Sequence, residues 1–487
     1  MDGYGPSVRS WFLVPAAVFS FSCGIDPVAP ADSGDLPSFD AGVTDAGAPD
    51  SGSSDAGVSD SGVSDSGAPD AGLEDAGFED AGHEDAGVDS GIDAGVVDGG
   101  GPFVDPCASS TAQCPGTPAN LVEGGGLRAI NRCAFPMSAA AGFLGNSALL
   151  DALEQRTTPV TVSQVVADAN RIATPSTTVP GGPAGVAWAF EWNAEDQAST
   201  TWIPQGITGS ADADATGLVG GKRIILVSFY EDAGLDKGVR IAFVDVTNPS
   251  APRYRFALLV EPTGTAAAPN FVQVDAHAGG IAWFGRWLYM AQTGSGFRVF
   301  DLSRVMQVAT DVDTVGCTAT TCRAGLYKYV IPQVGAYVDR SSCGPIFSWV
   351  SLDRGSSPPA LVSGEYCSTT ACTGPLAGRV FRWPLDPATG LLRGPGSTWP
   401  LDAFVMGQRQ VQGGAMRSGT TYLSSSAPAG GGGALYCLNP TRSLAANFSD
   451  SPEDLMVDGL NGQLWSLSEA AGARAVFAVR FTSYPVP

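Results

Sequence analysis

The stretch His277-Ala-Gly-Gly-Ile-Ala-Trp-Phe-Gly-Arg-Trp-Leu-Tyr-Met-Ala-Gln292, followed after a short turn by Gly296-Phe-Arg-Val-Phe-Asp-Leu302, specifies the fold most directly. A polar residue and small residues lead into a short apolar run, and a turn with glycine separates each run from the next. Short runs rich in aromatic and β-branched residues, bounded by glycine, are typical of strands. The stretch therefore predicts an antiparallel meander whose second and third strands lie at Trp287–Gln292 and Phe297–Leu302.

The same plan recurs along the C-terminal part of the chain. Four further units begin at Gln205-Gly-Ile-Thr, Ser348-Trp-Val-Ser-Leu-Asp353, Gln412-Gly-Gly-Ala-Met and Glu453-Asp-Leu-Met-Val-Asp. Repeated meanders of this kind indicate a β-propeller. We therefore predict an all-β fold with a five-bladed propeller over residues 181–487.

The last unit and the spacing between units bear on how the ring closes and how many blades it has. The last unit stops after its third strand, and residues 185–192, before the first unit, could supply the missing outer strand and remove exposed edges. Six blades are the alternative, because the first polar residues of the units are 41 to 74 positions apart. A β-sandwich is the third option.

A lead-in over residues 106–180 is expected to carry two short helices. Ser147–Glu154 has helical spacing of its apolar residues, and Thr161-Val-Ser-Gln164 resembles a capping box that opens a second helix over 162–171. Residues 173–182 contain two prolines and a pair of glycines, which predicts a linker before the propeller.

The segment 24–105 has a different composition, with an aspartate at every fifth position from Asp40 to Asp85. Residues 32–105 hold 19 acidic and no basic residues, whereas residues 106–487 hold 28 acidic and 25 basic ones, a net charge of -3. The acidic segment is predicted to be a disordered, extended tether. The near-neutral remainder gives no reason to expect nucleic acid or anionic lipid as a partner.

Residues 1–23 are predicted to direct export. Arg9 precedes an apolar run from Trp11 to Phe21, which suits a signal peptide and is too short to span a bilayer. Ser20-Phe-Ser-Cys23 resembles a bacterial lipobox, with Cys23 as the lipidation site; the alternative is an ordinary secretory signal. Asp-Ala-Gly tethers also resemble those of myxobacterial surface lipoproteins. We expect a monomer at the cell envelope or surface, or otherwise secreted, that touches a membrane only through its lipid.

Cysteine spacing favours disulfides. Four residues separate Cys317 from Cys322, and four separate Cys367 from Cys372. Both pairs lie in polar sequence typical of loops, which favours a disulfide within each pair. A Cys107–Cys114 bridge is the third predicted pair. Zinc is the alternative, although zinc sites more often use closer cysteine pairs with added histidine. Because nine cysteines follow Cys23, one thiol is left over.

The leading polar residues of the five units are expected to meet at one mouth of the propeller. Such a ring could bind a sugar or a metal, or it could satisfy buried strand ends. The predicted ring comprises Gln205, His277, Asp353 or its neighbour Ser351, Gln412 and Glu453. His277 is the only histidine after residue 83, which excludes a site with several histidines. The catalytic candidates are His277, Glu365 and Glu453.

Two further features bear on ligands. Asp212, Asp214 and Thr216 alternate like the start of a calcium loop, but Arg223 stands where a bidentate Glu is expected, so a polar turn is the alternative. Trp202, Trp283 and Trp287 could stack on sugars, although their positions in strands favour the core. Calcium is the one cofactor that these residues suggest.

Residues 145–487 also resemble a family of secreted actinobacterial and myxobacterial proteins. The phrases that carry the resemblance are Trp202-Ile-Pro-Gln-Gly-Ile, His277-Ala-Gly-Gly-Ile-Ala-Trp-Phe-Gly, Arg298-Val-Phe-Asp-Leu, Val350-Ser-Leu-Asp-Arg, Pro452-Glu-Asp-Leu and Leu464-Trp-Ser-Leu-Ser-Glu. The resemblance implies a fold and export, and no activity.

Two functions follow as expectations. The first is a cell-surface or secreted lipoprotein whose propeller binds an extracellular glycan or protein. The alternative is a calcium-assisted hydrolase or lactonase, because the propeller plan and Pro452-Glu-Asp-Leu resemble gluconolactonase-like proteins. In that reading Glu365 and Glu453 hold the metal and His277 moves the proton.

Overall fold

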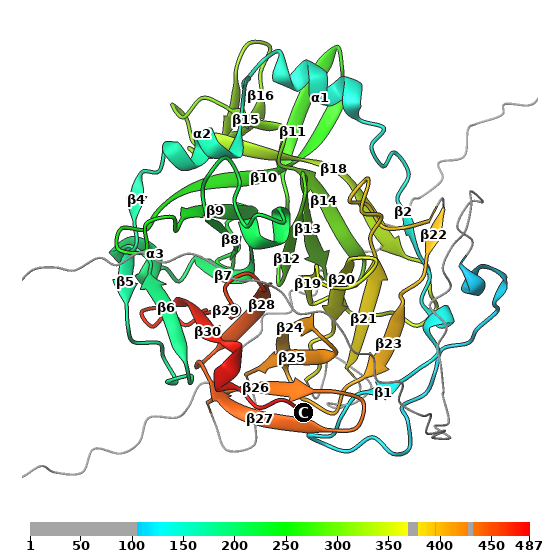
Figure 1. Ribbon diagram of the computed structural model, residues 1–487. Coiled ribbons are helices and arrows are strands. Elements are labelled where there is room, and N and C mark those ends of the chain that lie inside the picture. The colour runs from blue at the N-terminus through cyan, green and yellow to red at the C-terminus, as the bar shows by residue number, and fades with distance from the viewer. Residues whose placement is uncertain (1–104, 369–377, 395, 427–431) are drawn as a thin grey trace, which may run out of the picture. The chain divides into compact units, whose positions relative to one another are not determined.

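The computed structural model describes residues 105–368, 378–394, 396–426 and 432–487 (Figure 1). The predicted signal peptide, Cys23 and nearly all of the tether lie outside these residues. The described part is an all-β fold of antiparallel meanders, as the sequence predicts. No helix in it is long and apolar enough to cross a membrane.

Five meanders of four antiparallel strands follow one another in the described residues. The first comprises β7 (Trp202–Gly209), β8 (Ile224–Glu231), β9 (Val239–Asp245) and β10 (Arg253–Thr265). The second comprises β12 (Ile281–Phe284), β13 (Trp287–Gln292), β14 (Gly296–Asp301) and β18 (Tyr329–Asp339). The third comprises β19 (Trp349–Asp353), β20 (Ala360–Gly364), β21 (Arg379–Pro384) and β23 (Asp402–Val405). The fourth comprises β24 (Val411–Arg417), β25 (Thr420–Ser425), β26 (Gly433–Leu438) and β27 (Ser443–Phe448).

The fifth meander closes the ring with a strand from the other end of the domain. It comprises β28 (Pro452–Asp458), β29 (Gln463–Ser468), β30 (Val476–Arg480) and β6 (Val186–Glu191). The prediction that residues 185–192 supply the missing outer strand is therefore confirmed. Taken one meander to a blade, the pairing gives five blades. The number stays an interpretation, because parallel pairing of β10 with β18 merges two meanders into one sheet.

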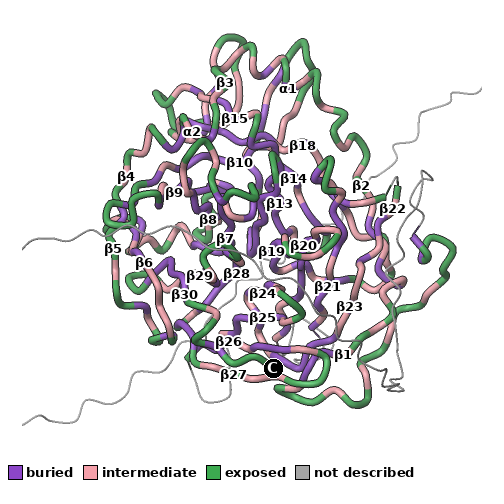
Figure 2. The backbone as a smooth tube through the Cα atoms, in the orientation of Figure 1, coloured by how far each residue is buried: buried purple, intermediate pink, exposed green. Residues whose placement is uncertain are grey.

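The first strands of the meanders surround the axis. β7, β12, β19, β24 and β28 lie around the centre of Figure 1, and each contacts its neighbours in the ring. Backbone contacts explain the glycines that follow the leading polar residues. A Cβ on Gly280 would lie 2.2 Å from the backbone nitrogen of Val350, and one on Gly413 would lie 2.5 Å from the Cα of Asp454. The buried residues gather at this centre (Figure 2), so inner strands pack directly against one another.

The lead-in extends the blades at their rim. α1 (Ser147–Glu154) has the predicted bounds, and α2 (Val162–Ala167) begins with the predicted Thr161 capping box but ends before Arg171. Short strands of this region pair with the blades: β1 (Arg128–Ala129) with β23, β2 (Met137–Ala139) with β18, β3 (Thr158–Val160) with β15 (Val305–Gln307), β4 (Arg171–Ile172) with β10, and β5 (Thr174–Ser176) with β6. The expected linker over 173–182 thus contains a strand.

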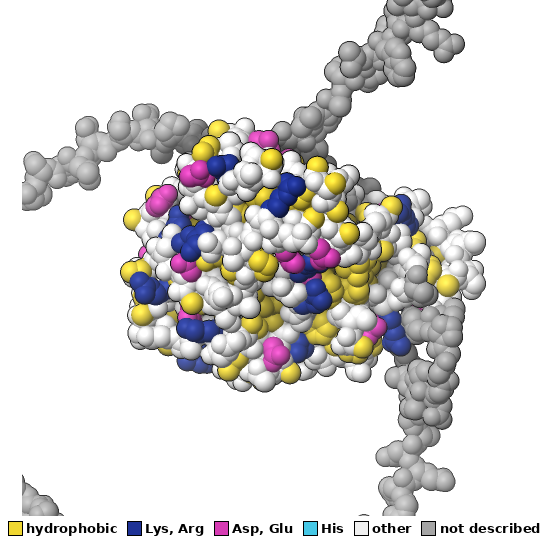
Figure 3. All heavy atoms as spheres, turned by 90° about the horizontal axis from the view of Figure 1, so that it is seen from above, with side chains coloured by type: hydrophobic (Ala, Val, Ile, Leu, Met, Phe, Trp, Pro, Cys, Tyr) yellow, Lys and Arg dark blue, Asp and Glu magenta, His cyan; other side chains and the backbone are white. Residues whose placement is uncertain are grey.

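The remaining elements are short, and the four-residue helix after β7 packs against the inner strands β7, β12 and β28. They are η1 (Pro106–Ser109), η2 (Arg132–Ala134), α3 (Ala194–Ala198), α4 (Ser210–Ala213), β11 (Ala268–Gln273), β16 (Val315–Cys317), β17 (Cys322–Ala324), β22 (Ser397–Thr398) and η3 (Phe481–Ser483). On the face seen from above, positive and negative side chains are interspersed (Figure 3). Arg304, for example, pairs with Asp151 and Glu154 of α1.

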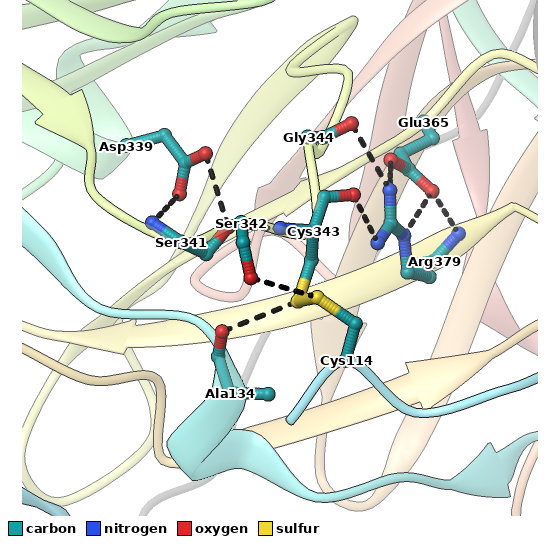
Figure 4. Close-up of a disulfide and its surroundings, with 9 residues drawn as sticks. All are labelled: Cys114, Ala134, Asp339, Ser341, Ser342, Cys343, Gly344, Glu365 and Arg379. Carbon is teal, nitrogen blue, oxygen red and sulfur yellow. Dashed lines mark hydrogen bonds and ion pairs between the residues drawn. A yellow bond between two sulfur atoms is a disulfide. The ribbon is translucent and has the colours of Figure 1, made fainter. Parts of the chain in front are cut away.

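The disulfides differ in part from the predicted ones. Cys317 bonds to Cys322, as expected. Cys107 bonds to Cys133, and Cys114 bonds to Cys343 (Figure 4), so the predicted Cys107–Cys114 bridge is wrong. Two 3-10 turns, η1 and η2, bring Cys107 to Cys133 across 26 residues, a pairing that sequence spacing cannot reveal.

The other cysteines complete the set. Cys367 is disulfide-bonded, and its predicted partner, Cys372, lies outside the described residues. Cys437 is a buried free thiol, and burial raises its pKa to about 12. It is therefore the unpaired cysteine of the described residues.

Candidate functional site

The predicted ring lies partly at one end of the propeller axis, which we call the leading end because the inner strands begin there. Gln205 donates a hydrogen bond from Nε2 to Oε2 of Glu469 at 2.8 Å. His277 packs against Tyr230, with ring centroids 4.4 Å apart, and burial lowers its pKa despite the opposing charge of Asp232. His277 is thus a neutral, packed side chain at pH 7.

Three ring residues lie in irregular strand segments. The pairing register shifts around Gln205 in β7, around Gln412 in β24 and around Glu453 in β28. Such bulges redirect side chains and often lie beside functional sites. Here they also let adjacent blades interlock, since Ser424 Oγ, in β25, donates a 2.6 Å hydrogen bond to the backbone carbonyl of Glu453 in β28.

Asp353 does not join the other ring residues. It is the last residue of β19, whereas Glu453 is the second residue of β28 and Gln205 lies in the first half of β7. It lines a cavity with residues that end β24 and β28, and is thus at the trailing end of the axis. Ser351, the alternative to Asp353, is buried within β19 and donates to the carbonyl of Gly414 at 2.6 Å. The prediction of one shared ring is therefore wrong for this blade.

Glu365 is held by a structural clamp. Its carboxylate accepts two hydrogen bonds from the Arg379 guanidinium, at 2.6 and 2.8 Å, and one each from the backbone amides of Ile346 and Arg379. Figure 4 shows this pair beside the Cys114–Cys343 disulfide. A carboxylate engaged in this way has no free lone pair directed at a metal, so Glu365 does not serve the role expected in the hydrolase reading.

Asp454 occupies the axis. Its Oδ2 accepts hydrogen bonds from the backbone amides of Ile207 in β7, at 3.1 Å, and Ile281 in β12, at 3.2 Å. Burial raises the pKa of Asp454 well above its ordinary value, against the effect of these bonds. The Asp454 carboxyl therefore joins three inner strands, β7, β12 and its own β28, and sequence alone placed it only near Glu453. This part of the ring is structural, one of the two roles considered above.

The calcium candidates do not converge. Asp212 is buried and accepts a hydrogen bond from Thr208 Oγ1 at 2.7 Å. Asp214 is exposed, and its Oδ1 accepts hydrogen bonds from the amide (2.8 Å) and hydroxyl (2.6 Å) of Thr216. This is the polar turn that was the alternative interpretation. Over the described ranges, no group of three His, Cys, Asp or Glu side chains could hold a metal ion.

A groove that sequence analysis did not find lies beside the start of β7. Two cavities of about 600 and 450 Å³ share four lining residues, Thr201, Trp202, Gly325 and Tyr327. Trp202 and Tyr327 are both half-buried, and their rings meet edge to face with centroids 6.2 Å apart. We call the joined cavities the Trp202 groove. Trp283 and Trp287, by contrast, are buried.

Basic side chains line the larger cavity. The guanidinium of Arg240 lies between Trp202 and Phe256, at 4.3 and 3.7 Å from their ring centroids. Asp196, from α3, pairs with Arg240 at 2.9 Å and with Arg171 at 3.2 Å. The stack and the ion pairs fix the geometry of this wall before any ligand arrives.

A second charged cluster faces the same cavity. Asp168 pairs with Lys328 at 2.9 Å and with Arg255 at 3.7 Å, and it accepts a hydrogen bond from Tyr329 at 2.8 Å. Burial opposes ionisation of Asp168, but the hydrogen bonds from Lys328 and Tyr329 and the nearby positive charges outweigh it and lower its pKa. Lys328 and Arg255 line the cavity, and Asp168, which does not, offsets part of their positive charge.

No protein-family model and no curated protein sequence matches the chain. Among solved structures, a gluconolactonase from Xanthomonas campestris is 12% identical, with a TM-score of 0.29 over 66% of this chain and 89% of that one. A GH43_1 enzyme from Xanthomonas citri is 11% identical, with a TM-score of 0.26 over 68% and 92%. Raptor from Chaetomium thermophilum is 8% identical, with a TM-score of 0.31 over 70% and 31%. At these scores, none of the three bears on the chemistry of this chain.

Proposed function

We propose that this protein is an exported, lipid-anchored binding protein that holds an acidic extracellular glycan in the Trp202 groove. The observation that carries the proposal is the pair of adjoining cavities divided by Trp202 and Tyr327. Aromatic side chains with one polar edge suit the mixed apolar and hydroxylated surface of a sugar ring. Two consecutive cavities suit two consecutive sugars of a chain.

The charge of the larger cavity supports an acidic glycan over a neutral one. Arg171, Arg240, Arg255 and Lys328 line it, against Glu195 and Asp196 in the lining and Asp168 behind it. The smaller cavity is lined by Asp236, Asp313 and Lys237. Guanidinium and ammonium groups bind carboxylates through charge-assisted hydrogen bonds. A concave site of this size also favours a glycan over the flatter surface of a folded protein.

The positions of the hydrolase candidates give that alternative no comparable support. Of the three candidates, Glu365 is engaged by Arg379, His277 packs against Tyr230, and Glu453 is buried. The lipid anchor is also part of the proposal. In the proposed protein the lipid on Cys23 is the only membrane attachment, so Cys23→Ser, which cannot be lipidated, should move the protein from the membrane to the soluble fraction.

Binding can be measured with polygalacturonate, an acidic polysaccharide, and with dextran as a neutral control. Trp202→Ala should weaken binding to polygalacturonate at least tenfold, while Trp188→Ala, at a half-buried tryptophan that does not line either cavity, should leave it unchanged. Equal binding of the two polysaccharides, or wild-type affinity in Trp202→Ala, would reject the proposal.

A further inference from the structure

The trailing end of the axis carries a cavity that the proposed function does not use. Its volume is about 430 Å³, within the range of small-molecule sites. It is lined by the ends of three inner strands and by the segment after β7, including Ala211, Asp353, Met416, Arg417 and Val457. β7, with eight residues, separates it from Trp202 by roughly 23 Å of strand. We call this cavity the axial pocket.

Three arginines and one aspartate line the axial pocket. Arg382 is neutralised by Asp353, at 3.3 Å, and by Asp402, at 2.7 Å. Within the described ranges, neither Arg354 nor Arg417 forms an ion pair with a carboxylate. Two positive charges of the pocket are therefore not balanced by its own side chains.

Both guanidinium groups are nevertheless fixed in place. Arg354 donates from Nη1 to the backbone carbonyl of Asp212 at 2.7 Å and lies over the ring of Phe284 at 5.3 Å. Arg417 lies over the ring of Phe481 at 4.6 Å. Fixed arginines lose little conformational entropy when they bind a carboxylate or phosphate, so the arrangement favours such a ligand.

The rest of the lining is mixed: apolar side chains stand beside Ser356, Ser418 and several glycines. Leu352, Met416 and Val457 form walls, and Leu460, which is 61% exposed, lies at the rim. We propose that the axial pocket binds a small molecule with an oxyanion group, a carboxylate or a phosphate, attached to an apolar body. Arg354 and Arg417 hold the oxyanion, and the apolar walls hold the body.

Three probes that share a phenyl ring test whether binding depends on the negative charge of the ligand: the anions benzoate and phenyl phosphate, and the neutral benzamide. Calorimetric titration of the full chain at low ionic strength should show binding of at least one anion and at least tenfold weaker binding of benzamide. Preference for benzoate or phenyl phosphate identifies which oxyanion the pocket takes. Equal affinity for all three, or no binding of either anion, overturns the proposal.

Variants then locate the anion. Arg354→Gln and Arg417→Gln should each weaken anion binding at least tenfold, whereas Arg442→Gln, at an exposed arginine outside the pocket, should not change it. Loss of binding in Arg255→Gln with full binding in Arg354→Gln would place the anion in the Trp202 groove and overturn the proposal.

A pair of rim variants keeps the test decisive if the arginine variants fail to fold. Leu460→Glu and Leu460→Gln change one exposed residue to side chains of nearly equal size that differ in charge. The added carboxylate should weaken anion binding several-fold relative to Leu460→Gln, because it lies at the entrance of a positive pocket. Equal anion affinity of these two variants would overturn the proposal.

Discussion

Asp212 is predicted to make the protein less stable as the pH rises. Asp212 belongs to α4, and its buried carboxyl accepts a hydrogen bond from Thr208. Burial raises its pKa from 3.8 to about 8, with a further contribution from Asp458 and opposing ones from Thr208 and Arg354. At neutral pH, the folded protein therefore keeps Asp212 protonated, while the unfolded chain ionises it.

The sign and size of the effect follow from proton linkage. Below the unfolded pKa of 3.8, both states are protonated and the stability from Asp212 is fully present. As the pH rises toward about 8, only the unfolded state loses the proton, so the free energy of unfolding falls by about 1.36 kcal/mol per pH unit. Over the whole window the loss is on the order of 5 kcal/mol, a large share of a typical domain's stability.

The substitution Asp212→Asn removes the proton equilibrium and keeps an oxygen that can accept the Thr208 hydrogen bond. Urea denaturation of the full chain at pH 5, 6, 7 and 8 gives the free energy of unfolding of both proteins. The difference between variant and wild type should shift steadily in favour of the variant as the pH rises. Comparison at each pH cancels the titration of all other groups.

Asp214→Asn is the matched control, because Asp214 lies two residues away and is exposed. Hydrogen bonds from Thr216 lower the pKa of Asp214, so its contribution is present above pH 3.8 and is lost only as the pH falls. This variant should show a small difference from wild type that stays constant between pH 5 and 8. A constant difference for Asp212→Asn as well would mean that the folded protein ionises Asp212, and it would refute the reasoning.

Two further predictions test the packing of the axis and the free thiol. Gly280→Ala should destabilise the protein by several kcal/mol, because the added Cβ would meet backbone atoms of Trp349 and Val350. Gly459→Ala is the control: its added Cβ meets nothing within 4 Å, so its melting temperature should stay close to that of the wild type. Equal melting temperatures would contradict the close contact of β12 and β19. Cys437 should react with a thiol reagent only in denaturant, since burial and a pKa of about 12 keep its thiolate scarce in the folded state; rapid labelling at pH 7 without denaturant would contradict this.

Local sequence signals predicted those parts of the fold that local interactions determine. The helix Ser147–Glu154 and the Thr161 capping box depend on neighbours within four residues. The meanders depend on short apolar runs and their turns, and the glycine at position 280 reports the close approach of another strand. The outer strand at 186–191 followed from the need to close a ring whose last unit lacked one.

The site could not be predicted in the same way, because its contacts join distant parts of the chain. The sequence does not show that Glu365 is engaged, because its partner Arg379 lies 14 residues away on the next strand. Asp353 follows the apolar residues of β19 and so lies at the end of that strand, whereas the predicted ring requires a residue at its beginning. The Trp202 groove joins residues from β4, β7, β9 and β10 and the segment at 325–328. Only Trp202 among them gave a sequence signal, and that signal equally fitted a core residue.

The closed axis explains why the groove lies away from it. Glycine contacts and the bridging carboxyl of Asp454 draw the inner strands together at the leading end. The groove instead forms where two peripheral elements meet the first meander: β4 of the lead-in brings Arg171 beside β10, and α3, which follows β6, carries Asp196 to Arg240. In the proposed function, β4 and α3 therefore add charged side chains to a groove whose aromatic side chains belong to the propeller itself, away from its axis.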